Sequence, residues 1–455
     1  MTDDFTCNTT ERPWNEIAGS QSSVTLRPRE LELSSNPERT QFHLLSFEAH
    51  DSYSRAGGLG TRVIGLSEAL ARAGYPTHVW FVGDPALPGY EADGALHLHR
   101  WCQWISAYHP KGVYDGDAGK ENDYASSLPP HLVQAQLLPH IQKGGKAVVI
   151  AEEWQTVNAV LHLDWLLRKA GIRQHVRIFW NANNVFGFEH IDWKRLERAA
   201  IITTVSRYMK QLMAAQGIES VSIPNGLAPD AYQPADSAAV RTLRQRFSNR
   251  LLLTKMARWD PDKRWLGSVE LVRELKSQGY RPLLIARGGS EAHGDEVLRA
   301  MADSGLHVLD RKAAAAGGLS GFIEALDQNN GYDVINYQSF IDSSSRRVLF
   351  QASDAVLANS RHEPFGLVGL EAMAVGGIAC TGCTGEEYAI GGHNALVLQT
   401  GQPSEFMGLY SQLRHSFEQM TSMRMAGRQT AQQYAWSEII QSSIIPRVLC
   451  AGPEF

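Results

Sequence analysis

The sequence predicts an α/β protein with two domains in series, each built around a largely parallel β-sheet. Two observations point to this fold. Short apolar runs typical of buried strands alternate with segments whose apolar residues recur at helical spacing, and this alternation pauses near residue 235 before it starts again. The chain also has 455 residues, whereas a single hydrophobic core stops growing at roughly 250–300 residues. We therefore expect two cores.

The composition is that of an ordinary globular protein, with 43% hydrophobic and 20% charged residues. The net charge of -5 argues against a nucleic-acid partner, because binding to phosphates requires a basic surface. No apolar run approaches the roughly 20 residues that cross a bilayer, and the first residues lack a signal-peptide pattern. We expect a cytoplasmic protein, with surface attachment to a membrane left open.

The five cysteines are scattered along the chain, which is typical of reduced thiols rather than of a disulfide framework. Cys380 and Cys383 have the spacing of a redox or metal-binding pair. No second such pair and no nearby pair of histidines completes a zinc set. We therefore interpret these two cysteines as small residues in a turn after a strand.

The first domain is expected to follow an N-terminal extension at residues 1–40, whose polar composition shows no period. Residues 41–48 then have the pattern of a buried strand, residues 61–74 that of an amphipathic helix with Gly74 at its end, and residues 76–83 that of the next strand. A strand, a glycine-rich loop, a helix and a second strand make a βαβ unit.

The same alternation continues to residue 226. Residues 99–135 differ, because their many aromatic, Gly and Pro residues show little periodicity, and we expect them to be loop-rich. The other expected elements of this domain are strands at 146–153, 176–183, 199–206 and 221–226 and helices at 157–171 and 206–217.

The second domain is expected after a linker rich in Pro, Ala and Asp at residues 225–240. A strand and a helix that ends at Gly279 open this domain, and further strands follow. The expected strands lie at 250–259, 281–289, 306–310, 333–339, 354–360 and 376–382.

The strongest functional signal is the string EPFGLVGLE at residues 363–371. It follows a predicted strand and opens a predicted helix, whose free N–H groups and positive dipole end suit a diphosphate. Its first glycine permits close approach of the backbone. The spacing of the two glutamates alone is equally compatible with an ordinary strand–helix junction, so the signal rests on the whole string.

This string resembles the E-x7-E signature of retaining glycosyltransferases of family four and of bacterial glycogen and starch synthases, which have the GT-B fold. Further segments resemble motifs of these enzymes in the same order. They are SRAGGLG at 54–60, IPNG at 223–226, RWDPDK at 258–263, and the turns GG at 376–377 and TGE at 384–386. The resemblance covers about residues 41–440, and motifs in the correct order make it specific.

The resemblance implies two Rossmann-like domains that face each other across a deep cleft. It implies that residues 41–235 bind the acceptor, with the stretch at 99–135 facing it, and that residues 236–435 bind the nucleotide sugar. YAWS at residues 434–437 resembles the point at which the chain of these enzymes returns to the first domain, so residues 436–455 are expected to pack there.

Arg258 and Lys263 match the phosphate-binding pair of these enzymes. Fixed cations at this place would stabilise the charge that develops on a departing nucleoside diphosphate. Each residue taken alone is equally compatible with a solvated surface cation. Arg55, which stands where the family has Lys, and the neighbouring Gly57 and Gly58 would approach the same diphosphate when the cleft closes. A plain tight turn is the alternative for the two glycines.

The resemblance also assigns roles around the E-x7-E string. Glu363 is expected near the reacting sugar, where we interpret it as a positioning and charge-stabilising residue rather than a nucleophile. Glu371 is expected to accept hydrogen bonds from the ribose hydroxyls. Gly366 and Leu367 are expected to contact the donor, as is Asn225 of the IPNG turn.

One departure from the family pattern concerns the donor sugar. These enzymes often have D-W-H-T after a strand of the first domain, and the histidine reaches the sugar. Here the string is EWQT, so Gln155 holds that place and can exchange hydrogen bonds but carries no charge. His162 and His362 are candidates to replace the histidine, with a structural role as the alternative. Asn183 follows another strand and suits either ligand contact or a turn.

We therefore predict a glycosyltransferase that moves a hexose from a nucleotide-diphosphate sugar to a hydroxyl of a glycan, lipid-linked sugar or small molecule, with retention. No metal and no other cofactor is expected, because the Arg258–Lys263 pair neutralises the diphosphate. A non-catalytic sugar- or nucleotide-binding protein, and a GT-B phosphorylase or epimerase, are the alternatives. A nicotinamide-dependent oxidoreductase is disfavoured, because no G-x-G-x-x-G follows the first strand.

Overall fold

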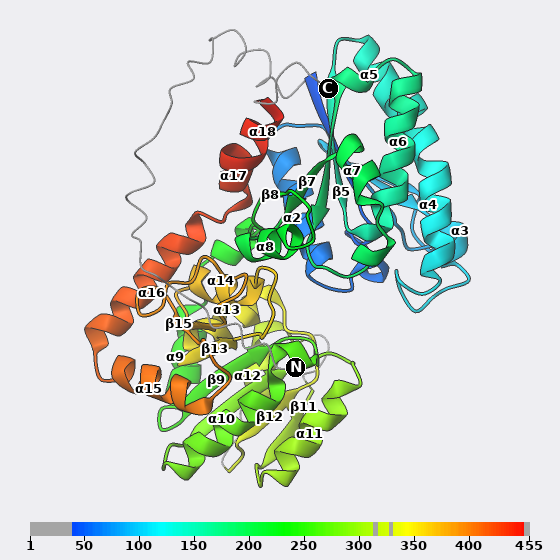
Figure 1. Cartoon of the computed structure of the whole chain (residues 1–455). Helices are drawn as coiled ribbons and strands as arrows, with labels where there is room; N and C mark the ends of the chain where they lie inside the picture. Colours follow the sequence, from blue (N-terminus) through cyan, green and yellow to red (C-terminus); the bar gives the residue numbers. More distant parts are fainter. Residues whose placement is uncertain (1–38, 313–316, 327–330, 450–455) are drawn as a thin grey trace, which may run out of the picture. The chain divides into compact units, whose positions relative to one another are not determined.

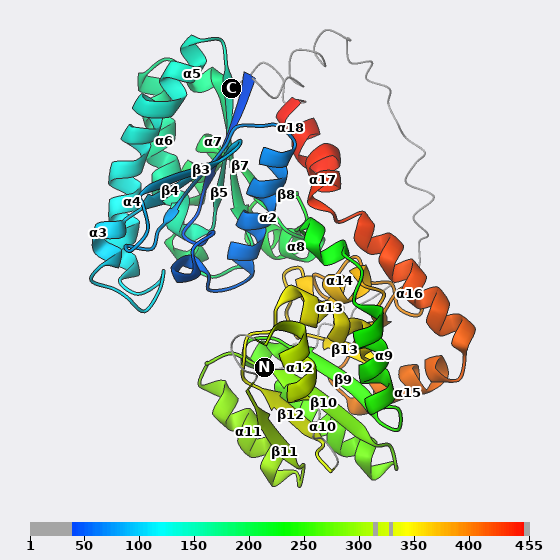
Figure 2. The same ribbon diagram turned by 180° about the vertical axis from the view of Figure 1, so that it is seen from behind.

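The computed structural model describes residues 39–312, 317–326 and 331–449. The chain forms two compact units (Figure 1 and Figure 2). The first unit extends to Gly226 and includes the segment that begins at Trp436, and the second unit is Leu227–Ala435. The N-terminal extension expected at residues 1–40 lies, up to residue 38, outside the described residues.

The first unit is built on an eight-stranded sheet with the order β3-β4-β2-β1-β5-β6-β7-β8. Neighbouring strands are parallel except for β3 and β4. The strands are β1 Thr40–Leu45, β2 Thr77–Val82, β3 Tyr90–Asp93, β4 Leu96–Trp101, β5 Lys146–Glu152, β6 Val176–Ala182, β7 Ile201–Thr204 and β8 Val221–Ser222. The apolar runs of β2 and β5 are buried almost throughout, as is usual for parallel strands covered on both faces.

The helices of the first unit include those that the sequence predicts. They are α2 Gly58–Arg72, α3 Gln103–Ser106, α4 Asp117–Leu132, α5 Leu138–Gln142, α6 Val157–Lys169, α7 Trp193–Ala199 and α8 Arg207–Ala214. The predicted βαβ unit is confirmed, because α2 joins β1 to the parallel strand β2.

The prediction that residues 99–135 are loop-rich was wrong, because the whole of α4 lies there. Tyr124 and Leu128 of this helix are fully buried, and the helix packs against α6. Pro129 and Pro130 fall in its last turn, where the chain continues into one turn of π-helix instead of ending. Burial of the apolar face therefore outweighs the two prolines.

Strands β1, β2 and β4 place three histidines side by side. His43, His78 and His97 are direct partners in the parallel register, and their rings stack at centroid distances of 4.8 and 4.5 Å. In the next row Trp80 stacks on His99 at 3.7 Å. Burial and the adjacent imidazoles lower the pKa of both His78 and His99 to about 3. These histidines are therefore neutral at physiological pH.

The histidine row is expected to make the fold sensitive to acid. A histidine whose folded pKa lies below its unfolded value of about 6.5 binds protons more readily in the unfolded chain. Its effect on stability is therefore constant above pH ~6.5, and stability is lost as the pH falls from there toward the folded pKa near 3. Each such histidine adds at most about 1.4 kcal/mol per pH unit to the slope with which the free energy of unfolding falls.

The measurement is the thermal midpoint of the wild type at pH values between about 7.5 and 5. We expect His78→Phe, which keeps a stacked ring but cannot titrate, to weaken the pH dependence. His190→Phe is the matched control, because the His190 side chain is 61% exposed. Parallel curves for His78→Phe and the wild type would rule out this explanation.

The chain returns to the first unit at Trp436, which begins helix α17 Trp436–Ile439, with a π-helical turn and α18 Ile445–Leu449 after it. Trp436 is only 1% exposed. Its ring lies against Gly65 and Gly226, where an added Cβ would come within 2.3 and 2.5 Å of ring atoms. Both positions therefore need glycine because the tryptophan occupies the space.

The second unit contains a seven-stranded sheet with the order β11-β12-β10-β9-β13-β14-β15, in which all neighbouring strands are parallel. The strands are β9 Leu251–Met256, β10 Pro282–Arg287, β11 Val308–Arg311, β12 Val334–Tyr337, β13 Ala355–Ala358, β14 Ala379–Thr381 and β15 Leu396–Val397. The helices are α9 Ser237–Arg246, α10 Trp265–Ser277, α11 His293–Asp303, α12 Gly318–Ala325, α13 Ser343–Ala352, α14 Leu367–Ala374, α15 Pro403–Arg414 and α16 Phe417–Gln432. Because the strands are parallel, their C-terminal ends lie along one edge of the sheet.

The expected linker at residues 225–240 contains the boundary between Gly226 and Leu227, a 3-10 turn and the start of α9. The Leu227 amide donates to the Tyr434 carbonyl at 2.8 Å. The chain therefore enters and leaves the second unit side by side.

Candidate functional site

Lys263 and Glu363 meet at the C-terminal edge of the second sheet, in the loops after β9 and β13. The Lys263 ammonium donates to Glu363 Oε2 at 2.6 Å, and the Ser360 hydroxyl donates to the same oxygen at 2.7 Å. The two charged side chains are 20% and 17% exposed. The structure thus joins the predicted phosphate-binding lysine to the predicted sugar-positioning glutamate as a charge-assisted pair.

The turn after β14 forms hydrogen bonds with the loop that carries Glu363. The Glu363 amide donates to Thr384 Oγ1 at 2.9 Å, and the Gly385 amide donates to the Glu363 carbonyl at 2.8 Å. A Cβ on Gly385 would come within 2.2 Å of that carbonyl. Burial raises the pKa of the adjacent Glu386 to about 8, and the charge of Glu363 acts in the same direction. The TGE turn therefore fixes where Glu363 lies.

Arg258 lies at the same edge as Lys263 but is exposed. Its carbonyl accepts a hydrogen bond from Trp265 Nε1 at 2.7 Å, while its guanidinium has no hydrogen bond or ion pair with any described residue. His362 is also exposed, and its Nδ1 lies 3.2 Å from Asp262 Oδ1, beside Lys263. Arg258 is therefore the cation of the predicted pair that is available to a ligand without breaking an internal contact.

Gly366 precedes α14 with a φ of +81°, a conformation that favours glycine. A Cβ there would lie 2.7 Å from Glu386 Cγ and 3.1 Å from Glu363 Cγ. Leu367 is the first residue of α14 and is half-buried. Glu363 therefore lies before the helix, and Glu371 lies on it, so the two glutamates do not share a helical face.

Glu371 has partners of its own. Arg346 Nη2 lies 3.5 Å from its Oε1, and Ser343 and Asp230 line the same small cavity, which is about 10 Å³ in volume. Burial raises the pKa of Glu371, although Arg346 opposes this effect. The two glutamates of the string thus belong to two separate polar clusters.

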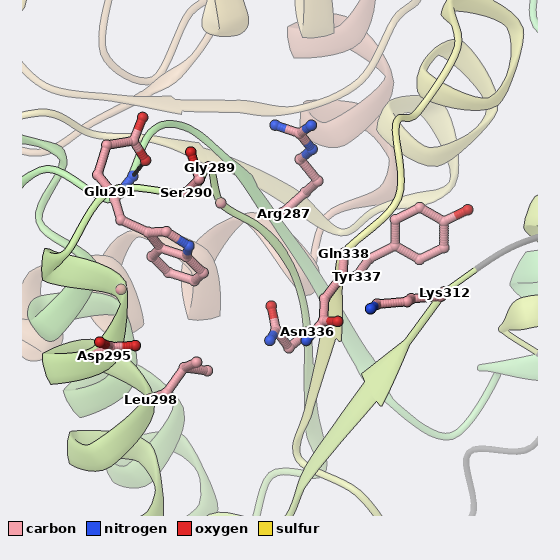
Figure 3. Close-up of a pocket in the computed structure, with 13 residues that line it drawn as sticks. Arg287, Gly289, Ser290, Glu291, Asp295, Leu298, Lys312, Asn336, Tyr337 and Gln338 are labelled. Atoms are coloured by element: carbon pink, nitrogen blue, oxygen red, sulfur yellow. Dashed lines mark hydrogen bonds between the residues drawn. The ribbon is translucent and has the colours of Figure 1, made fainter. Parts of the chain in front are cut away.

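A cavity in this unit has a volume of about 560 Å³. Figure 3 shows it between α11, which carries Asp295 and Leu298, and the strand ends that carry Asn336 and Lys312. The lining residues are Trp259, Arg287, Gly288, Gly289, Ser290, Glu291, Gly294, Asp295, Leu298, Lys312, Asn336, Tyr337 and Gln338. The sequence pattern did not reveal this cavity, because residues 281–289 have the pattern of a strand, although an Arg-Gly-Gly string ends that run.

In the first unit, the N-terminus of α2 is occupied by a carboxylate of the chain itself. Glu48 Oε2 accepts hydrogen bonds from the amides of Ala56, Gly57 and Gly60 at 2.9–3.1 Å. The Gly57 amide, which was expected to face a diphosphate, thus has an acceptor within the chain, because a helix N-terminus attracts the nearest buried anion. The Gly58 amide has no acceptor among the described residues. Glu48, an acidic residue at the end of the predicted strand 41–48, was the signal that could have revealed this contact.

Among the other predicted residues of the first unit, Arg55 and His162 have hydrogen-bond partners within the chain, whereas a side-chain atom of Gln155 has none among the described residues. Arg55 is exposed, and its Nη2 donates to the His50 carbonyl at 2.7 Å. Gln155 is only 6% exposed, and its Oε1 has no hydrogen-bond partner among the described residues. His162 contacts the Ala125 carbonyl at 2.9 Å, which ties α6 to α4. Gln155 thus keeps a free polar atom at the end of β5.

Asn183 and Asn225 belong to a buried network around Glu152. Asn183 Nδ2 donates to Glu152 Oε2 at 2.8 Å, and Arg62 donates to Asn225 Oδ1 at 2.7 Å and to Glu152 Oε1 at 2.9 Å. Arg62 and Glu152 are 2% and 0% exposed. The network ties α2 to the ends of the strands, and it occupies the polar groups that were expected to contact the donor or acceptor.

Two further features of the described residues concern metals and membranes. No group of three His, Cys, Asp or Glu side chains among them is arranged to hold a metal ion. No helix within the described ranges is long and apolar enough to cross a bilayer.

The sequence of the second unit matches a known family. Residues 245–430 match the family described as glycosyl transferases group 1. This stretch, which is less than half of the chain, is similar to that family. Arg258, Lys263, Glu363 and Glu371 all lie within the matched residues, whereas the predicted residues of the first unit lie outside the match.

Solved structures resemble the whole described architecture. A sucrose-phosphate synthase from Thermosynechococcus elongatus matches with a TM-score of 0.62 at 19% identity, covering 90% of this chain and 99% of that one. The catalytic domain of starch synthase IV from Arabidopsis thaliana, bound to ADP and acarbose, matches with a TM-score of 0.61 at 16% identity, with coverage of 90% and 99%. The Anabaena protein HepE, in complex with UDP and glucose, matches with a TM-score of 0.56 at 15% identity, again with coverage of 90% and 99%.

These similarities confirm the predicted GT-B fold, and at such identities they show the fold alone. No curated protein sequence matches the chain significantly. The family match of residues 245–430 and the fold together support a glycosyltransferase that uses a nucleotide sugar.

Proposed function

We propose that the protein transfers a hexose from a nucleoside-diphosphate sugar to an acceptor hydroxyl, with retention of anomeric configuration and without a metal ion. The contact between Lys263, Glu363 and Ser360 beside the start of α14 carries this proposal. It places a cation, a carboxylate and a helix N-terminus at one sheet edge, where ligands of α/β domains bind.

The diphosphate is the leaving group, and its negative charge grows as the bond to the sugar breaks. Arg258 is exposed and unpaired among the described residues, and Lys263 is held 2.6 Å from Glu363. Lys263 is proposed to be held near the place where the charge develops, and the exposed Arg258 is proposed to turn toward the bound diphosphate. Positive charge placed there stabilises the transition state more than the ground state. These two cations perform the task that a divalent ion performs in other transferases.

The two glutamates then have different tasks. Glu363, which is paired with Lys263, is proposed to orient the sugar hydroxyls and to stabilise the positive charge that develops on the sugar ring. Glu371 lies in a separate polar cluster with Arg346, and it is proposed to accept hydrogen bonds from the ribose. The cavity of about 560 Å³ lies at the ends of the neighbouring strands and is proposed to receive the rest of the nucleotide.

A non-catalytic binding protein is the second candidate, and Gln155 is the observation that favours it. Glutamine stands where the resemblance places a histidine, and its buried Oε1 lacks a partner among the described residues. A binding protein would hold the donor but would not turn it over. The release of nucleoside diphosphate from a nucleotide sugar in the presence of an acceptor distinguishes the two candidates.

The first test is a thermal-shift titration with UDP, GDP and ADP. A nucleotide at about 100 times its Kd stabilises the folded state by roughly 2.7 kcal/mol, which raises the thermal midpoint by several degrees. We expect one of the three to do so for the wild type, and Arg258→Ala with Lys263→Ala to abolish the shift. The starch synthase structure contains ADP and the Anabaena structure contains UDP, so both bases are tested.

The matched control is Arg273→Ala with Lys276→Ala, which removes two cations from α10 of the same unit. Arg273 is 55% exposed, and Lys276 pairs with Asp333 at the opposite edge of the sheet. The control should keep the full nucleotide shift. If no nucleotide stabilises the folded wild type at millimolar concentration, the donor-site proposal fails.

A further inference from the structure

Lys255 is a charged residue in the core of the second unit that the proposed mechanism does not use. It lies on the central strand β9 and is 1% exposed. Its ammonium lies 5.5 Å from the ring centre of Trp265 on α10. A buried lysine is costly unless its charge is satisfied by close hydrogen bonds. Its presence in an otherwise apolar core therefore needs an explanation.

The hydrogen bonds of Lys255 are long for an ammonium group. Its Nζ donates to the Leu357 carbonyl at 3.3 Å and to Asn359 Oδ1 at 3.1 Å. Lys120 of the first unit is equally buried but is fully satisfied. Its Nζ donates to four oxygens at 2.6–3.1 Å, from Tyr53, Gly112, Val113 and Asp115. One buried lysine thus has a full set of close hydrogen bonds, whereas the other is only weakly held.

The charged groups around Lys255 belong mostly to the candidate donor site. Glu363 after β13 favours the protonated form, and Lys263 and Arg264 after β9 oppose it. From β14 the buried thiol of Cys380 faces the same amine. Burial, the largest effect, and the two cations hold the pKa of Lys255 at about 7. A small change of charge at the site is therefore enough to change the protonation of Lys255 near neutral pH.

We propose that Lys255 takes up a proton from solvent when a nucleoside diphosphate binds beside Lys263. The buried ammonium of Lys255 then balances the added negative charge from within the core. This inference rests on the proposed function, because the diphosphate is its ligand. The anion offsets the field of Lys263 and Arg264, which opposes protonation in the free protein. The contact of the ammonium with Asn359 then tightens next to Ser360, which holds Glu363.

Coupled proton uptake makes nucleotide affinity depend on pH in a defined direction. Binding favours the protonated form, so affinity is higher near pH ~7 than near pH ~9, and we expect roughly a fivefold difference. At pH ~7.5 about half a proton should be taken up for each nucleotide bound. Glu386 also adjoins Glu363, so the contribution of Lys255 is the difference between the wild type and a variant without the amine.

The test is isothermal titration calorimetry of the full chain with whichever of UDP, GDP and ADP stabilises it. Titrations at pH ~7.5 in Tris and in HEPES buffer, which differ in ionisation enthalpy, give the number of protons taken up. Lys255→Met, which keeps the volume of the buried chain, should lose most of the uptake and most of the fivefold pH effect. Lys276→Met, at the opposite sheet edge, should keep both.

Uptake that is unchanged in Lys255→Met would overturn the inference while leaving the proposed function intact. The absence of any nucleotide binding to the wild type would instead overturn the proposed function. If Lys255→Met does not fold, Lys255→Gln takes its place. The wild type is informative by itself, because binding with no proton uptake at pH ~7.5 excludes the inference without any variant.

Discussion

Replacing Lys263 with alanine is expected to lower kcat/KM for glycosyl transfer by about 100- to 1,000-fold, since one preorganised group that faces developing charge is worth this much in other enzymes. Lys263 is 20% exposed and held 2.6 Å from Glu363. Under the proposed function it is therefore held where the diphosphate charge grows. The loss should fall mainly on kcat, because the charge is largest in the transition state. Initial rates with the nucleotide sugar of the preferred base measure it.

The controls for this prediction separate charge from packing. Lys263→Arg keeps the charge but changes its shape, and should recover part of the rate. Lys276→Ala removes a lysine that pairs with Asp333 at 2.7 Å, away from the site, and should leave the rate unchanged. If Lys263→Ala kept the kcat of the wild type, Lys263 would have no role in catalysis.

Much of the candidate donor site could be predicted, because its residues lie in short strings at strand ends. Lys263, Glu363 and Glu371 follow β9 and β13, and a parallel sheet brings such ends to one edge whatever the details of packing. The separate partners of the two glutamates could not be predicted. Glu371 contacts Arg346 on α13, and that contact depends on how two helices pack.

The contacts that the sequence did not reveal are those between distant segments. Glu48 occupies the amides at the start of α2, although many acidic residues of the chain could have done so. The row of His43, His78 and His97 depends on the register of three strands. A change of one residue in that register would send each histidine to the opposite face. The pattern of a single strand therefore cannot reveal it.

The α4 helix shows a different limit. The many aromatic, Gly and Pro residues at 99–135 predicted irregular structure, whereas burial of Tyr124 and Leu128 stabilises a helix there. Local propensity is weak compared with the burial of an apolar face. Asn225 shows a related limit. Its string resembles a ligand-binding turn, whereas in this structure the Asn225 side chain accepts a hydrogen bond from Arg62 in a buried network.

The IPNG string also ends in Gly226, which leads to a prediction about stability. Trp436 is 1% exposed and lies against Gly226 and Gly65, and Arg62 lies 5.6 Å from its ring centre. Trp436→Ala should therefore lower the free energy of unfolding of the first unit by about 3–5 kcal/mol. Urea unfolding of the full chain measures it. Trp104→Ala is the control, because Trp104 is 67% exposed and should change stability by less than about 0.5 kcal/mol.

A double-mutant cycle tests whether the glycine serves the tryptophan. Gly226→Ala alone should destabilise the protein, because its Cβ would come within 2.5 Å of the Trp436 ring. In the Trp436→Ala background that ring is gone, so the same substitution should cost little, and the two changes should be strongly non-additive. Additive effects would mean that Gly226 is needed for its backbone conformation instead. Non-additive effects would assign the glycine of this string to packing against the returning segment, independently of any role in binding the donor.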